Sequence, residues 1–71
     1  MVDIGNKIKE LRQQKRITQN QVAMKLGVSS QAVSKWENNL SCPDIMLLPR
    51  IAKLFDVSID ELFFDEREEW F

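Results

Sequence analysis

The segment from Gln19 to Asn38 constrains the fold most, because it contains two short helical patterns separated by residues 26–29. Ala23 is small enough to let two helices approach closely. Gly27 suits a turn position with a positive φ, where a Cβ would clash. Val33 supplies an apolar contact on the inner face of the second pattern, between polar neighbours. The segment therefore predicts two helices joined by a tight turn.

That layout is a helix-turn-helix, in which the second helix is held out for insertion into the major groove of DNA. The net charge of −1 conceals a division along the chain. Residues 1–40 carry seven Lys and Arg against three Asp and Glu, whereas residues 41–71 carry three against eight. Phosphate binding responds to the local patch rather than to the total. The basic half, which holds the motif, therefore suits DNA, although two solvated surfaces without a partner explain the charge division alone equally well.

Length and composition indicate a single small domain. The chain has 71 residues, 44% of them hydrophobic, which is ordinary for a globular domain. It contains neither an apolar run long enough to span a membrane nor a signal-peptide pattern. Its single cysteine, Cys42, cannot form an internal disulfide, which fits a reducing compartment. We therefore expect a soluble cytoplasmic protein that makes no membrane contact.

Spacing and capping residues predict the first three helices. The apolar residues of the first helix lie four and three positions apart, on one face, and this helix should end near residues 15–16. Thr18 and Gln21 form a capping box that starts the second helix by satisfying free backbone amides. Ser29 caps the third helix, which residues 38–39 end, because Asn tolerates a left-handed conformation. The inward side chains should be Ile4, Ile8, Leu11, Val22, Ala23 and Leu26.

Two further helices are expected in the second half. Asp44 can cap a fourth helix, but Pro49 lacks an amide hydrogen and disfavours the helical region for Leu48. Either the first turn is loosened from Asp44 onward or the helix begins near Pro49. Ser58 and Glu61 form a second capping box for a short fifth helix. The inward side chains should be Leu47 or Leu48, Ile51, Ala52 and Phe55, followed by Ile59, Leu62 and Phe63.

Seven short motifs follow one another in a fixed order over nearly the whole chain. They are Ile8-Lys9-Glu10-Leu11-Arg12, Ile17-Thr18-Gln19, Leu26-Gly27-Val28-Ser29, Val33-Ser34-Lys35-Trp36-Glu37-Asn38, Pro43-Asp44-Ile45, Ile51-Ala52-Lys53-Leu54-Phe55 and Val57-Ser58-Ile59-Asp60-Glu61-Leu62. In this set the chain resembles the Cro/lambda-repressor type of helix-turn-helix, also called the XRE family. The resemblance implies an all-α, compact five-helix bundle. It also implies a sequence-specific transcriptional regulator, expected to be a repressor, that binds double-stranded operator DNA as a homodimer.

The resemblance also implies which side chains read the bases. Ser30, Gln31 and Ser34 would face the groove edge, on a helix spanning residues 30–38. Gln31 is the strongest reader, because a Gln amide can pair with adenine through two hydrogen bonds. Lys35 could reach guanine or a phosphate. Because these side chains are short, specificity is expected to be modest or to depend on DNA shape.

Further positions would contact the DNA backbone or stabilise the fold. Gln19, at the start of the second helix, would touch a phosphate, where the helix dipole favours an anion. Asn38 would bind phosphate beyond the third helix. Arg16 stands where the family commonly has Gly, so either the turn adapts or Arg16 takes an unfavourable φ, and it can add a phosphate contact. Arg12 and Glu37 match an internal ion pair of the family.

Other conspicuous residues have structural interpretations. Trp36 is placed in the core rather than against a base, because it lies three positions from Val33. Met24 and Met46 are expected to be packing or dimer-surface residues. Cys42 is expected to be inert, since a thiol sensor needs an activating cation or helix N-terminus.

Nothing in the composition supports catalysis. The chain has no His and one Cys, which excludes imidazole bases, Cys-His pairs and Cys/His zinc sites. No Gly-rich phosphate loop or calcium loop occurs. We therefore expect no enzyme, no cofactor and no metal.

The end of the chain is explained least by the resemblance. Residues 1–64 are predicted to form the DNA-binding domain, and residues 65–71 an acidic, aromatic tail. Phe64, Trp70 and Phe71 exceed what a small core can cover. They could bury against a second copy, lead into a further domain, or fray. The alternative function is a protein-interaction module, such as an antitoxin whose acidic half covers a basic partner.

Overall fold

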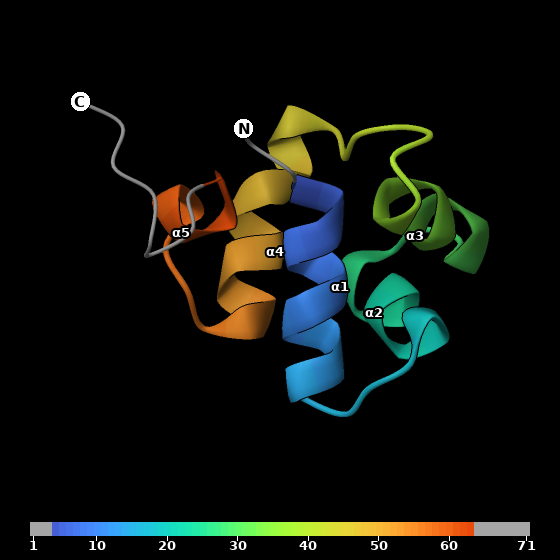
Figure 1. Ribbon diagram of the computed structural model, residues 1–71, viewed down its shortest axis with the longest axis horizontal. Helices are drawn as coiled ribbons and strands as arrows, with labels where there is room; N and C mark the ends of the chain where they lie inside the picture. The colour runs from blue at the N-terminus through green and yellow to red at the C-terminus, as the bar shows by residue number, and fades with distance from the viewer. Residues whose placement is uncertain (1–3, 64–71) are drawn as a thin grey trace.

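The computed structural model describes residues 4–63 and shows five α-helices and one 3-10 turn (Figure 1). The elements are α1 (Ile4–Gln14), α2 (Gln19–Leu26), α3 (Ser30–Glu37), η1 (Ile45–Leu47), α4 (Leu48–Phe55) and α5 (Ile59–Phe63). Within residues 4–63 there is no strand, and no helix is long and apolar enough to cross a membrane. The prediction of an all-α five-helix bundle is confirmed. The expectations for Phe64 and the 65–71 tail lie outside the described residues.

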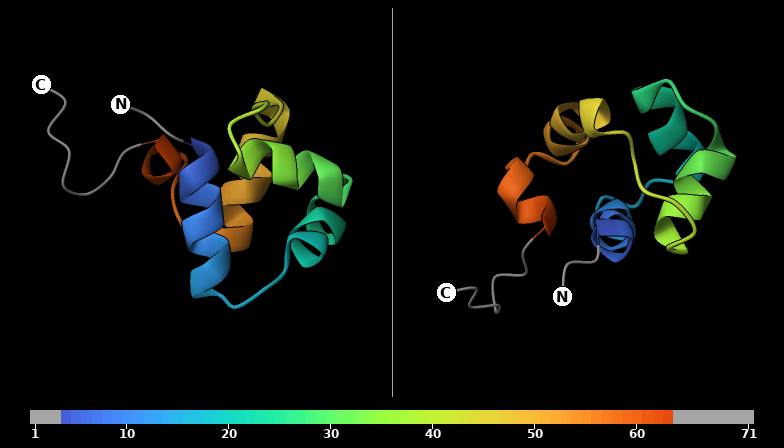
Figure 2. Two further views of the ribbon diagram at one scale, coloured as in Figure 1. Left: turned by 45° about the vertical axis from the view of Figure 1, so that its right-hand side comes forward. Right: turned by 90° about the horizontal axis from the view of Figure 1, so that it is seen from above.

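The helices surround one core (Figures 1 and 2). Helix α1 packs against α3 on one side and α5 on the other, and α2 packs against α3 and α4. Helix α4 also contacts α5 and η1, which completes the enclosure. The two helices of the motif are therefore supported by the rest of the domain, α3 chiefly by α1 and α2.

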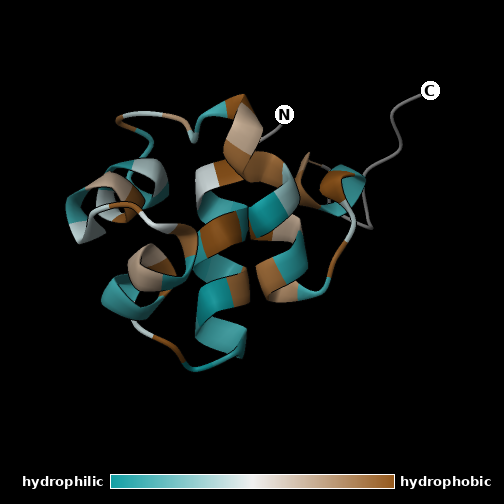
Figure 3. Cartoon of the chain, turned by 180° about the vertical axis from the view of Figure 1, so that it is seen from behind, coloured by the Kyte–Doolittle hydropathy of each residue, from teal (hydrophilic) through white to brown (hydrophobic). Residues whose placement is uncertain are grey.

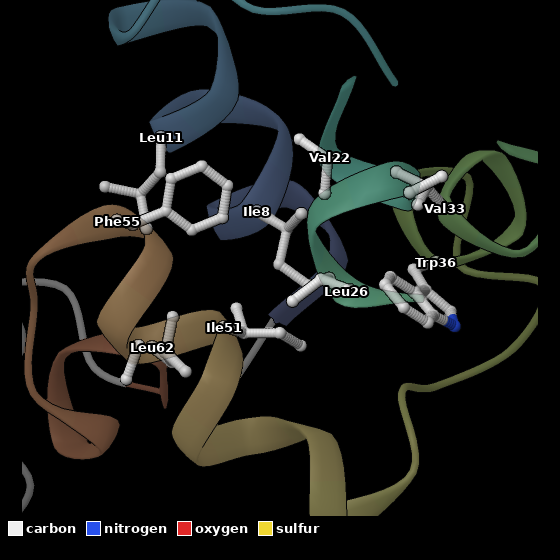
Figure 4. Close-up of a cluster of buried hydrophobic side chains, with 11 residues drawn as sticks. Ile8, Leu11, Val22, Leu26, Val33, Trp36, Ile51, Phe55 and Leu62 are labelled. Atoms are coloured by element: carbon white, nitrogen blue, oxygen red, sulfur yellow. The ribbon is translucent and has the colours of Figure 1, made fainter. Parts of the chain in front are cut away.

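The core takes side chains from every α-helix (Figure 4). Ile8, Val22, Val33 and Ile51 are fully buried at its centre. Burying each of these side chains contributes about 1.5–3 kcal/mol. These side chains reach the core because hydrophobic and hydrophilic positions alternate along α1 and α4 at helical spacing (Figure 3). Trp36 is also buried, which confirms its predicted place in the core.

The helix boundaries follow the predicted caps. Thr18 and Gln21 form both hydrogen bonds of the first capping box, and Ser58 and Glu61 form both of the second. The Asp44 side chain accepts a hydrogen bond from the backbone N–H of Met46 at 2.8 Å. The chain from Asp44 therefore makes a 3-10 turn first, and α4 follows with Pro49 in its first turn, where no amide hydrogen is needed. Both expectations for this helix hold in part.

One expectation for a buried side chain is wrong, and one of two alternatives is excluded for two others. Ile59 is 40% exposed, because it is the first residue of a five-residue helix and lies at the margin of the core, whereas Leu62 of the same helix is buried. Met24 and Met46 are more than 70% exposed, so neither packs in the core. Their expectation as surface residues for a dimer remains untested.

Candidate nucleic-acid interface

Helix α3 is divided between a buried and an open side. Val33, Trp36 and Glu37 are buried against the rest of the domain. The residues expected to meet the groove lie elsewhere on the helix: Gln31 and Lys35 are exposed, and Ser30 and Ser34 are half-buried. Ser29 precedes them as the N-cap, accepting a hydrogen bond from the backbone N–H of Ala32. The structure thus brings the four predicted base-reading residues together on one short helix.

The carboxylate of Glu37, at the C-terminal end of α3, is hydrogen-bonded to side chains of two other helices. Glu37 accepts two hydrogen bonds from Arg12 of α1, from Nε at 2.8 Å and from Nη2 at 3.1 Å. Arg12 also donates to the carbonyl oxygen of Ile17, in the turn between α1 and α2. Buried charges are stable only when paired and hydrogen-bonded, and this pair meets both conditions. The predicted internal ion pair is confirmed.

Gln19 joins the same carboxylate. Its Nε2 donates to Oε1 of Glu37 at 3.1 Å, so the start of α2 is linked to the end of α3. A primary amide has two hydrogens on nitrogen, and one remains for an outside acceptor such as a phosphate. The bond to Glu37, which the sequence did not indicate, therefore leaves the predicted phosphate contact possible.

The close approach of α1 and α3 depends on Gly5. A Cβ at this position would overlap the carbonyl oxygen of Trp36 and press against the side chain of Asn39. Only glycine lets the first turn of α1 lie this close to the last turn of α3. An isolated glycine in a helical pattern is the signal that could have revealed the contact, but sequence reasoning did not use it.

Asn38, predicted to bind a phosphate, makes local hydrogen bonds within its own helix end. Its Nδ2 donates to the carbonyl oxygen of Ser34 at 2.9 Å and lies 3.4 Å from the Ser34 hydroxyl. Phosphate oxygens only accept hydrogen bonds, so a side-chain contact would use the remaining amide hydrogen or exchange this bond. Gln31 is less constrained, because its Oε1 receives only a long hydrogen bond of 3.5 Å from Ser30.

Of the two possibilities at its position, Arg16 adopts the unfavourable φ. Its φ is 57°, in the left-handed region, and its side chain is exposed in the turn between α1 and α2. Asn39, just after α3, also has a positive φ, of 60°. A Cβ in this region costs about 1–2 kcal/mol, although Asn tolerates it better than most residues. Arg16 therefore holds a strained backbone while presenting a positive charge to solvent.

Neither a metal-binding group nor a disulfide is present in the part of the chain that the structure describes. Among residues 4–63, no group of three His, Cys, Asp or Glu side chains could hold a metal ion. Cys42 is exposed and unpaired by any disulfide. The polar side of α3 and the start of α2 present hydrogen-bonding side chains together with one cation, Lys35.

Comparison with known proteins supports this assignment. A family model described as Helix-turn-helix matches residues 8–62. The HTH-type transcriptional activator BcrR of Enterococcus faecalis is 42% identical over 65 residues, which cover 92% of this chain and 32% of BcrR. An uncharacterized HTH-type transcriptional regulator of Methanocaldococcus jannaschii is 39% identical over 64 residues, covering 90% and 97% of the two chains. The P22 c2 repressor, solved with a synthetic operator, superposes with a TM-score of 0.79 at 30% identity, covering 84% of this chain and 91% of the repressor chain. The chain thus spans about a third of BcrR's length but nearly all of the second relative.

Proposed function

The chain belongs to the helix-turn-helix family, and from that membership we propose that it is a DNA-binding transcriptional regulator. It acts by binding rather than by catalysis, with residues 1–64 as the binding unit, in the cytoplasm. The observation that carries the proposal is the division of α3, whose inner side is fixed in the core while its polar residues stay open. A helix held in this way can enter a major groove without losing its place in the fold.

The roles of the individual side chains follow from their chemistry. Gln31 offers an acceptor and a donor on one amide, which match the N6 amino group and N7 of adenine. Lys35 donates to guanine or to a phosphate, and Ser30 and Ser34 fill the space beside them. Gln19, Arg16 and Asn38 flank this surface and contact the phosphates. Backbone contacts fix the position of the protein, and the base contacts supply the specificity.

The proposed partners are double-stranded DNA and a second copy of the chain. A homodimer would place two copies of α3 on half-sites about one helical turn apart. The c2 repressor, bound to a synthetic operator in its solved structure, supports the DNA partner, and related transcriptional regulators favour this function over that of an antitoxin. We propose repression as the direction of control, although BcrR is described as an activator.

The deciding experiment is selection of bound sequences from a random pool of duplex DNA. The full chain should enrich one sequence whose two halves are symmetric, and binding should weaken steeply with salt. Absence of any salt-dependent affinity for duplex DNA would contradict the proposal. Enrichment of a single, non-repeated half-site would retain DNA binding but contradict the homodimer. A reporter gene placed behind the selected site then tests repression, which predicts lower expression in the presence of the protein.

A further inference from the structure

A pocket of about 280 Å³ lies between α2 and α4, apart from the proposed reading surface. Its lining combines two apolar side chains with three cationic ones: Leu26, Leu54, Lys25, Arg50 and Lys53. All three cationic residues are exposed, and no carboxylate among residues 4–63 forms an ion pair with any of them. This concentration of positive charge is therefore available to an outside partner.

The pocket is lined by α2 and α4 and by no residue of α3. Lys25 and Leu26, in the last turn of α2, face Arg50, Lys53 and Leu54 of α4 across it. At the other end of α2, Gln19 bonds to Glu37 of α3. Lys25 lies six positions after Gln19, which corresponds to about 9 Å along the axis.

The chemistry of the pocket favours a polypeptide over a nucleic acid. Leu26 is buried in the core, so the apolar wall is chiefly the half-buried Leu54, which offers no hydrogen-bond donor to a phosphate. Its volume is below the usual range for a drug-sized ligand and suits one or two side chains. Isolated surface ion pairs contribute little, about 0–1 kcal/mol each, so a partner needs carboxylates for the three cations and an apolar side chain for the wall.

We propose that this pocket docks an acidic segment of a partner protein, with a bulky apolar side chain against the half-buried Leu54 and carboxylates at Lys25, Arg50 and Lys53. The surface would let the regulator hold a protein while α3 remains free for DNA. This inference is independent of DNA binding, because it uses none of the residues assigned to the reading surface or its flanks.

The test uses the full chain and a fluorescein-labelled synthetic peptide of alternating Glu and Leu residues. Binding is measured by fluorescence anisotropy, and the site is mapped by amide chemical shifts. The double variant Arg50→Ala/Lys53→Ala is compared with Lys9→Ala/Lys15→Ala, which removes two exposed cations from α1 and the turn after it. Circular dichroism verifies that both variants are folded.

The proposal predicts that the pocket variant lowers peptide affinity at least tenfold, while the control variant changes it less than twofold. Replacing Glu by Gln in the peptide should abolish binding, and the shifts should centre on Leu26 and Leu54. Equal losses in the two variants, or shifts spread over the surface, would overturn the proposal by showing non-specific attraction. A loss of duplex DNA affinity in the pocket variant beyond that of the control would overturn it in favour of a phosphate contact.

Discussion

Arg12 and Glu37, 25 positions apart in the chain, are joined by two hydrogen bonds whose carboxylate is almost entirely removed from solvent. The same carboxylate receives the amide of Gln19. One acidic side chain thus holds α1, the start of α2 and the end of α3 together. The orientation of the proposed reading helix therefore depends on a buried electrostatic contact as well as on apolar packing.

Replacing Glu37 by Ala should lower the free energy of unfolding by about 3 kcal/mol, because it leaves Arg12 partly buried without its counter-ion. Urea denaturation of the two proteins measures the difference. Glu10→Ala is the matched control, since Glu10 is exposed on α1 and its removal should change stability by no more than about 0.5 kcal/mol. Equal effects of the two substitutions would show that the buried pair does not stabilise the fold.

Gln31→Ala should reduce affinity for a selected site by about 1–3 kcal/mol and relax the preference at one base pair. The reason is that Gln31 is the one side-chain amide within α3, is exposed, and can form two hydrogen bonds with a base. Competition binding with each of the four base pairs at every position measures both effects. Gln13→Ala, an exposed amide on α1, should leave affinity unchanged. If Gln31→Ala weakens all sequences equally, Gln31 contacts the backbone instead.

Lys35→Ala separates two roles that are both open to this residue. If Lys35 contacts a phosphate, the substitution should reduce the slope of log K against log salt by about 1 and affect all sequences alike. If it contacts guanine, the preference for one base pair should be lost as well. Binding of selected and random duplexes over a range of salt concentrations distinguishes the two results. Lys9→Ala serves as the control and should leave slope and preference unaltered, so a Lys35→Ala result matching it would exclude Lys35 from the interface.

Arg16→Gly should raise the free energy of unfolding by up to about 1 kcal/mol, because glycine relieves the left-handed strain at φ 57°. The same change should weaken DNA binding if the guanidinium contacts a phosphate. Lys15→Gly removes a charge from the neighbouring position, whose φ is not positive, and should only destabilise. Thermal unfolding and DNA titration of both variants test the pair of effects. A stability loss in Arg16→Gly would show that its side chain contributes more than the strain costs.

The second capping box makes a prediction for acid stability. The backbone N–H of Ser58 donates to Glu61 Oε1, and this bond, aided by the Ser58 hydroxyl and the charge of Lys7, lowers the pKa of Glu61 from its ordinary value near 4.5. Because the folded pKa lies below the unfolded one, the stabilisation is present above the ordinary value and is lost as pH falls through the lowered one. Glu61→Gln should therefore flatten the dependence of the urea midpoint on pH below about 4.5. Asp60→Asn is the control, because it removes a neighbouring charge and leaves the bond between Ser58 and Glu61 intact. An equal flattening of the pH dependence in this variant would show that the loss of one negative charge, and not the loss of that bond, causes the effect.

The features that the sequence predicted correctly are those that depend on neighbouring residues. Thr18 and Ser58 cap helices through bonds that close within three positions, and the burial of Val33 follows from helical spacing. The base-reading positions came from the resemblance to a known family and stay predictions. The resemblance to a known family added the ion pair of Arg12 and Glu37, which no local pattern indicates.

The contacts that escaped prediction join segments that are distant along the chain. Gly5 meets Trp36 and Asn39 only after α1 and α3 have packed, and Gln19 reaches Glu37 only when α2 and α3 are in place. The pocket beside Lys25 likewise arises from the packing of α2 on α4. Helical spacing predicts burial for Ile59, which is exposed, because periodicity indicates the direction of a side chain but not how far the core extends.

The separation of roles along α3 has a practical consequence. Gln31 and Lys35 carry no core packing, whereas Val33 and Trp36 are enclosed by it. The outer side chains can accordingly be exchanged as a set without rebuilding the interior, so that libraries varied at these positions would sample new DNA targets on an unchanged scaffold. A domain of this size is thereby a starting point for engineered regulators, in which the preferred DNA sequence is changed and the core residues are kept.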